Sequence, residues 1–202
     1  MNSEEFKLLS KRMNVLKRRF ITAKVKKNPT TFYSQDFMKS FRILFHSEIE
    51  YYFESIAIKK VEKSLSLWLH DQTINATLLG IMAFSRNFLP NVPRKLSEIS
   101  NRNDLNFRIH STVKWYKDLI EKSNNGIKEN NIIPIIVPLG IDYTKINQEL
   151  LSALTTYGSK RGELAHVSYA KVINIMDPSD EIQATELIVT EIKILDELLN
   201  CL

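Results

Sequence analysis

The sequence predicts an all-α fold, and three observations support this prediction. The 202 residues include only five glycines and six prolines, so long segments run without a helix breaker. Apolar residues recur three or four positions apart over most of the chain, which is the period of a helix buried on one face. Asn-Gly turns between alternating apolar runs do not occur, nor does a regular series of short strand-like segments.

The composition is that of a globular protein, with 44% hydrophobic and 25% charged residues, and the length suits one hydrophobic core. We therefore expect a single domain over residues 1–202. The only cysteine, Cys201, cannot form an internal disulfide, which favours a reducing, cytoplasmic location. No basic-then-apolar signal segment opens the chain, and the longest apolar run, residues 132–141, is short and broken by two prolines. We expect neither export by that route nor a membrane-spanning segment.

The first two helices follow from their apolar stripes. Residues 1–25 are predicted to form a helix that ends before Asn28-Pro29. Its stripe is Phe6, Leu9, Met13, Leu16 and Phe20. A second pattern runs from Ser34 to Trp68 and predicts a helix of about 35 residues, long enough to be the central spine of the fold.

Shorter helices are predicted at residues 74–88, 96–101 and 107–122, followed by a break at residues 123–126, Ser-Asn-Asn-Gly. Residues 132–141 are β-branched and apolar, which on propensity alone favours a strand. Because the sequence offers no partner strand, we interpret this segment as a buried connector.

The C-terminal third should hold two more helices. Asp142 is the expected N-cap of a helix that continues to Tyr157, and Gly158 is expected to end or bend it. A helix junction would then lie at residues 159–161, with the chain continuing to about residue 175. Asp177-Pro178 is predicted to open the last helix. Its apolar stripe is Ile182, Leu187 (or Ala184), Val189, Ile192, Leu195 and Leu199.

Charge is distributed unevenly along the chain. The basic N-terminal helix, residues 1–27, holds nine Lys or Arg against two Glu, whereas residues 177–202 hold seven Asp or Glu against one Lys. The basic helix could dock on the acidic one or bind a polyanion such as RNA. Two solvated faces that loosely complement each other would give the same pattern.

Residues 161–166, Arg-Gly-Glu-Leu-Ala-His, combine a permanent cation with a side chain that exchanges a proton near neutral pH. This pairing suits phosphodiester chemistry, which needs a fixed positive charge on the phosphate and a group that moves a proton. At 100° per residue, however, Arg161 and His166 lie about 140° apart on a regular helix. They would cooperate only if Arg161 lies on an irregular turn or if two copies of the motif meet at a symmetric interface. Alternatively, both are ordinary structural residues.

Three segments together resemble the HEPN superfamily of small all-α proteins, in particular its RiboL-PSP-HEPN branch. The first is residues 161–166, which resemble the family's Arg-x4-6-His motif, with Tyr169 shortly after it. The second is residues 47–53, Ser-Glu-Ile-Glu-Tyr-Tyr-Phe, similar to the acidic and aromatic stretch on the family's long early helix. The third is the lead-in at residues 139–154. The resemblance covers residues 35–202.

The resemblance implies a HEPN-like helical bundle that forms a homodimer and cleaves RNA without a metal or cofactor. Arg161 would hold the scissile phosphate and His166 would move the proton, while Glu50, or less readily Glu48, would orient one of them and Tyr169 would contact a phosphate oxygen. The basic residues expected to bind RNA are Lys160, Lys17, Arg18 and Arg19. An antitoxin or defence-system partner is a further expectation. The alternative is a non-catalytic module that binds RNA or another protein.

One position departs from the family pattern. Many ribonuclease members carry a polar residue directly after the motif arginine, and here that residue is Gly162. Other chemistry finds less support, because His46, His70 and His110 do not pair at metal-ligand spacing and no glycine-rich phosphate loop is present.

Overall fold

The computed structural model describes residues 2–85, 93–101, 104–166 and 175–202, and every regular element in these ranges is a helix. The all-α prediction is thus confirmed for the described residues. The chain divides into two compact units, which are described separately below. Single-domain folding stays a prediction. The first unit comprises Met1–Phe53, Gly126–Ile132 and Thr144–Cys201, and the second comprises Glu54–Asn125, Ile133–Tyr143 and Leu202.

The first unit begins with two helices where one was predicted. Helix α1 spans Glu4–Phe20 and α2 spans Ala23–Lys27. The predicted helix over residues 1–25 is therefore wrong at its end. The physical reason is Thr22, whose side chain accepts a hydrogen bond from the Val25 amide and so starts a new helix.

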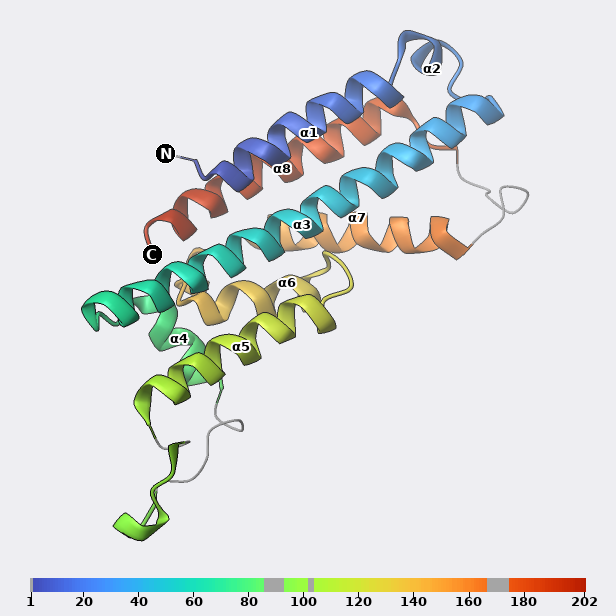
Figure 1. Cartoon of the computed structure of the whole chain (residues 1–202). Coiled ribbons are helices and arrows are strands. Elements are labelled where there is room, and N and C mark those ends of the chain that lie inside the picture. Colours follow the sequence, from blue (N-terminus) through green and yellow to red (C-terminus); the bar gives the residue numbers. More distant parts are fainter. Residues whose placement is uncertain (1, 86–92, 102–103, 167–174) are drawn as a thin grey trace. The chain divides into compact units, whose positions relative to one another are not determined.

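The basic first helix docks on the acidic last one. Helix α8 spans Pro178–Asn200, and α1 lies beside it (Figure 1). The Ser3 amide donates to Asp196 Oδ2 over 2.8 Å, and Lys17 Nζ lies 2.6 Å from Glu186 Oε1. Asp196 is fully buried and also accepts from the Tyr52 hydroxyl at 3.0 Å. Polar capping and charge pairing therefore join the two ends of the sequence.

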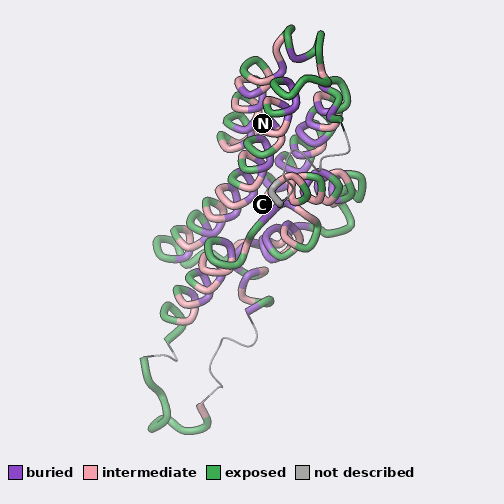
Figure 2. The backbone as a smooth tube through the Cα atoms, turned by 90° about the vertical axis from the view of Figure 1, so that its right-hand side faces the viewer, coloured by how far each residue is buried: buried purple, intermediate pink, exposed green. Residues whose placement is uncertain are grey.

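Helix α8 opens as predicted, because Asp177 caps it and Pro178 occupies its first turn. Its predicted apolar stripe is wrong at one position. Leu187 is 39% exposed, and Ile188 is the buried residue at that turn. Figure 2 shows that buried residues recur along one side of the long helices, which is the pattern expected for amphipathic packing.

Helix α3 spans Phe32–Asp71, so the predicted long helix is confirmed and is slightly longer than expected. Its first half belongs to the first unit and its second half to the second. In the first unit it carries the aromatic core residues Phe41, Phe45 and Tyr52, each at most 1% exposed. The Phe45 ring meets the ring of Tyr157 edge-on, with centroids 5.9 Å apart. This contact fixes α7 (Gln148–His166) against α3.

The second unit contains α4 (Ala76–Phe84), the short 3₁₀ turns η1 (Leu96–Glu98) and η3 (Val137–Leu139), and α5 (Leu105–Ser123). Helix α4 packs against both α5 and η3. Contact with η3 is very close, since a Cβ atom on Gly80 would lie 2.5 Å from the Pro138 carbonyl oxygen. A glycine is thus required at this crossing.

The β-branched segment at residues 132–141 is neither strand nor irregular connector. It forms the end of α6 (Glu129–Ile136) and then η3. Its burial was predicted correctly for Ile132, Ile136 and Leu139. Since no described segment is a strand that could pair with it, helical hydrogen bonding is the remaining way to satisfy this buried backbone, and it overrides the β propensity.

Helix α7 begins later than predicted. Asp142 is followed by the 3₁₀ turn η4 (Tyr143–Lys145), and the Asn147 side chain accepts from the Glu149 amide at 2.9 Å instead. Asn147 therefore performs the local capping that was assigned to Asp142. None of the helices in the described ranges is long and apolar enough to cross a membrane.

Candidate functional site

Helix α7 runs without interruption through the motif, so the predicted junction at residues 159–161 is wrong. Gly158 does not end the helix, because α7 continues to His166. A Cβ atom there would lie 3.1 Å from Lys128 Cγ and 3.3 Å from Ile127 Cγ1. The glycine allows the segment before α6 to pack closely on α7, which is a different use from helix termination.

The continuous helix removes one of the two ways in which Arg161 and His166 could cooperate. Both residues lie within α7, so the irregular turn that would have brought them together is absent from the described chain. At 100° per residue they point about 140° apart. Only the backbone of His166 is described, and Tyr169 lies outside the described residues. Within one chain, motif positions 161 and 166 therefore lie on different faces of α7.

Arg161 lies close to His46 on α3, a residue that the motif does not contain. The positive charge of Arg161 contributes to lowering the pKa of His46. Arg161 Nε is buried and has no hydrogen-bond partner among the described residues. A buried guanidinium N–H without an acceptor is costly, which makes Arg161 a candidate for an electrostatic site.

His46 is 4% exposed, and its pKa is lowered from 6.5 to about 4, first by burial and then by the Arg161 charge. The imidazole is therefore uncharged at neutral pH. Its Nδ1 atom is buried and has no hydrogen-bond partner among the described residues. Gly126 borders the other side of the ring, where an added Cβ would lie 4.0 Å from Nε2.

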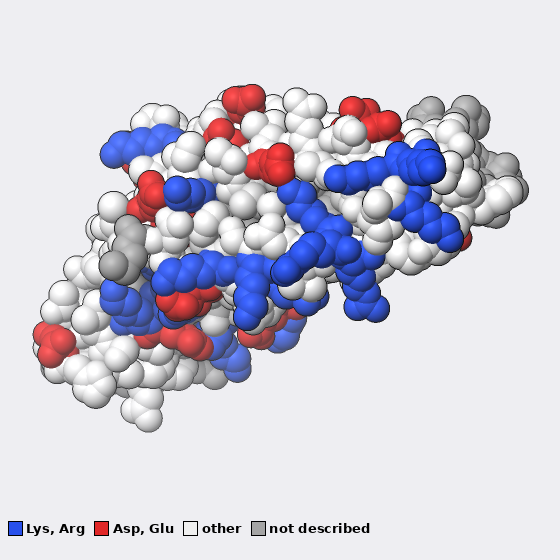
Figure 3. All heavy atoms as spheres, turned by 90° about the horizontal axis from the view of Figure 1, so that it is seen from above, with Lys and Arg blue, Asp and Glu red and all other residues white. Residues whose placement is uncertain are grey.

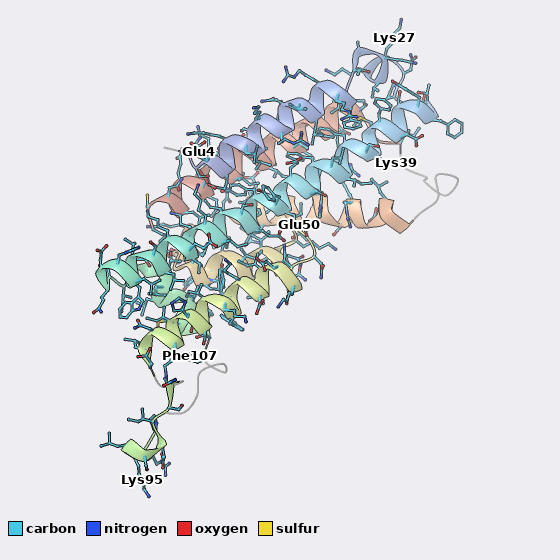
Figure 4. All side chains as sticks on the ribbon, in the orientation of Figure 1. Glu4, Lys27, Lys39, Glu50, Lys95 and Phe107 are labelled. Carbon is cyan, nitrogen blue, oxygen red and sulfur yellow. The ribbon has the colours of Figure 1, made fainter. Side chains whose placement is uncertain are left out.

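Glu50 follows His46 by one helical turn and joins this group. Its Oε2 lies 3.9 Å from His46 Nδ1, which is ion-pair range but longer than a hydrogen bond. The Glu50 side chain is partly exposed and lies midway along α3 (Figure 4). Glu48 is engaged elsewhere, because its carboxylate accepts from Arg12 Nε at 2.8 Å. Of the two carboxylates considered from the sequence, Glu50 is the one beside His46.

We call His46, Glu50 and Arg161 the buried cluster, after the burial of His46; Glu50 and Arg161 are partly exposed. It contains a fixed cation, a neutral imidazole and a carboxylate, supplied by two helices that are distant in sequence. Such a group can bind an oxyanion at Arg161 and order hydrogen bonds around it. Groups of three or more His, Cys, Asp or Glu side chains placed to hold a metal ion are not found in the described part of the chain.

Sequence reasoning missed His46. It considered that histidine only as a metal ligand, although a usable signal was present. Arg42, His46 and Glu50 are spaced four residues apart, which places all three on one face of the long helix. A histidine between two charged residues on such a face is a candidate for an electrostatic site. Nothing in the sequence, however, paired that face with Arg161.

The basic residues expected to bind RNA lie in two places. Lys160 is exposed and borders a cavity between α7 and α8. Lys17 is paired with Glu186, whereas Arg18 Nε donates to the Asn14 carbonyl of its own helix at 3.3 Å. Arg19 lies 5.5 Å from the centroid of the Phe20 ring. Many Lys and Arg side chains gather on the face that carries α1 and α2 (Figure 3).

Comparisons of the chain with protein-family models, with curated proteins and with solved structures found no match. The HEPN resemblance therefore rests on the quoted residues alone. The geometry of the buried cluster is an independent observation that does not depend on that resemblance.

Proposed function

We propose that the protein is a metal-independent endoribonuclease of HEPN type, acting in the cytoplasm in a defence or toxin-antitoxin context. The observation that carries the proposal is the buried cluster, in which His46 Nδ1 lies 3.9 Å from Glu50 Oε2 and the charge of Arg161 acts on the same imidazole. Two buried nitrogen atoms of the cluster, one on Arg161 and one on His46, have no partner among the described residues.

In the proposed reaction, RNA supplies its own nucleophile. The 2′-oxygen attacks the adjacent phosphorus, the bond from phosphorus to the 5′-oxygen breaks, and a 2′,3′-cyclic phosphate remains. Arg161 binds the phosphate oxygens and offsets the negative charge that builds up on them. His166 takes the proton of the 2′-hydroxyl or gives one to the leaving 5′-oxygen. Tyr169 donates to a phosphate oxygen.

His46 has a different part in this proposal. With a pKa of about 4 it is a weak base at neutral pH, so it does not replace His166 as the proton carrier. A phosphate bound at Arg161 would bring negative charge next to the ring and raise the pKa of His46.

The spacing of the motif residues supports a homodimer. Because α7 is continuous, positions 161 and 166 lie on different faces of one regular helix. Two motifs that meet across a twofold axis would supply Arg161 from one chain and His166 from the other. The proposed active site is therefore shared between two chains.

The experiment is an RNA cleavage assay in EDTA with the wild type, Arg161→Ala and His166→Ala. We expect cleavage by the wild type and a loss of at least about a hundredfold in each variant, as is typical for removal of a charge-stabilising or proton-transferring group. Arg94→Ala and His110→Ala are matched controls, since both residues are exposed and lie outside the buried cluster. Activity that survives in both motif variants would rule out this mechanism.

A second function, RNA binding without cleavage, is favoured by the basic face of α1 and α2. Lys11, Arg18 and Lys27 are exposed on this face and supplement the pair formed by Lys17. Gly162 also leaves the place of the family's polar residue without a side chain. Binding that weakens steeply with salt, and that Arg18→Gln and Arg19→Gln reduce without any RNA cleavage by the wild type, would favour this function.

A further inference from the structure

The first unit contains a cavity of about 340 Å³ between α7 and α8, on the side of α7 away from the segment before α6. Its size falls in the range of small-molecule sites, roughly 300–1,000 Å³. Small residues create it. Ala153 on α7 and Ala184 on α8 line the space, so the two helices pack along their length while leaving room between them.

Part of the cavity lining is an ion pair between Arg42 and Glu181, and the Arg42 guanidinium lies near the Tyr157 ring. Arg42 Nε donates to Glu181 Oε1 at 3.0 Å, and a second guanidinium nitrogen donates to Glu181 Oε2. The two side chains are 11% and 3% exposed. The Arg42 guanidinium lies 5.7 Å from the centroid of the buried Tyr157 ring. Such a bidentate pair holds Arg42 rigidly in the wall.

The lining selects against a free polyanion. Two cations, Arg42 and Lys160, face three carboxylates, while Leu187 and Ile188 add apolar surface. Arg42 donates to Glu181 through two of the guanidinium nitrogens. A guanidinium has five N–H donors, so the cavity can offer a donor to a carbonyl oxygen or ring nitrogen. An uncharged heteroaromatic ring fits this combination.

The cavity adjoins the buried cluster. Arg42 of the cavity and His46 of the cluster are four residues apart on α3, and Tyr157 and Arg161 are four residues apart on α7. Each pair is separated by roughly 6 Å along its helix axis. Lys160 lies at the cavity and directly precedes Arg161. A ligand that spans both places would have a ring at one end and a phosphate at the other.

We infer that this cavity binds a nucleobase, and that its natural occupant is the base next to the phosphate held by Arg161. The base would lie against Ile188 and Leu187, accept from Arg42, and leave its phosphate beside Lys160. The assignment to RNA rests on the proposed function. A free nucleoside presents the same ring chemistry, so the experiment separates the two sources.

The test is a methyl NMR titration of the full-length protein that follows Ala, Leu and Ile resonances. Adenosine, cytidine and uridine are added singly, then a single-stranded tetranucleotide and the same oligonucleotide with abasic positions. We expect saturable shifts at Ala184 and Ile188. If the occupant is an RNA base, the tetranucleotide binds at least about tenfold more tightly than any nucleoside and the abasic oligonucleotide loses that gain. A nucleoside that binds as tightly identifies a free nucleoside as the occupant.

Two variants fill the cavity. Ala184→Phe occupies its interior, and Thr156→Phe fills it from an exposed position that the fold tolerates more readily. Each variant should weaken nucleoside binding about tenfold or more, since the nucleobase would lose its contact surface in the cavity. Ala83→Phe is the matched control, because Ala83 is exposed on α4 and does not line the cavity.

The result that overturns the inference is an absence of saturable shifts at these methyl groups with every nucleoside and oligonucleotide. Unchanged binding in both filling variants would overturn it as well. The cleavage assay tests the proposed function independently of the titration. Arg161→Ala should abolish cleavage but leave the chemical-shift changes caused by nucleosides unchanged. A protein that binds nucleosides in the cavity without cutting RNA would therefore refute only the nuclease proposal.

Discussion

His46 links the buried cluster to the stability of the fold. Its pKa is about 4 in the folded protein and about 6.5 in an unfolded chain, so the unfolded state binds the proton more readily. The neutral histidine is compatible with the fold above pH 6.5, and the folded state is progressively disfavoured as the pH falls toward 4. Between pH 7 and pH 5 this corresponds to a loss of about 2 kcal/mol in the free energy of unfolding.

Urea unfolding at pH 7 and pH 5 measures this loss. The substitution His46→Gln should remove most of the difference between the two pH values, because glutamine does not titrate. His110→Gln is the matched control, since His110 is exposed on α5 and should leave the pH dependence as in the wild type. An equal pH dependence in His46→Gln and the wild type would mean that His46 is not the titrating group.

Gly162 occupies the position where many ribonucleases of the HEPN superfamily, which the motif resembles, carry a polar residue. A Cβ atom there would meet no atom within 4 Å, and the residue lies inside α7. We therefore predict that Gly162→Asn is accommodated and increases RNA cleavage in EDTA, because it supplies the missing polar group beside Arg161. Gly162→Ala is the control for helix propensity. If Asn and Ala give the same cleavage rate, the polar group has no role in turnover.

At the scale of elements, two glycines in helices should respond oppositely to the same substitution. Gly162→Ala should raise the free energy of unfolding by roughly 0.5–1 kcal/mol, because alanine restricts the unfolded chain and favours the helix. Gly80→Ala should lower it by roughly 1–3 kcal/mol, because its Cβ would clash with the Pro138 carbonyl where α4 crosses η3. Chemical denaturation of both variants measures the contrast, and stabilisation by Gly80→Ala would contradict the close packing.

The elements that the sequence predicted well are those with a long, one-sided apolar pattern. Helix α3 and the Asp177 cap of α8 were both predicted, since periodicity and capping are local signals. The predictions failed where tertiary contacts determine the local backbone conformation. Gly158 stays helical because the segment at Lys128 packs on it, and residues 132–141 become helical in spite of their β-branched composition. No local signal distinguishes these cases.

In the candidate site as well, the sequence predicted residues that belong to a recognisable motif and missed those whose role depends on tertiary contacts. The sequence identified Arg161 as a phosphate-binding candidate because it belongs to a short motif, and the resemblance to the HEPN superfamily added Glu50 as a residue that could orient Arg161 or His166. It did not identify His46, since the importance of that side chain comes from Arg161 on another helix. The cavity between α7 and α8 was missed for the same reason. Its small residues leave a cavity only because α7 and α8 face each other in the folded chain.

At the scale of the whole molecule, the central claim is that two chains share each active site. The most direct measurement mixes the inactive variants Arg161→Ala and His166→Ala and assays RNA cleavage in EDTA after subunit exchange. In a mixed dimer, one site combines the intact Arg161 of one chain with the intact His166 of the other. Random exchange should restore about one quarter of wild-type activity, because half of the dimers are mixed and each holds one intact site. A mixture that stays inactive after exchange, beside an active wild type, would contradict the shared site.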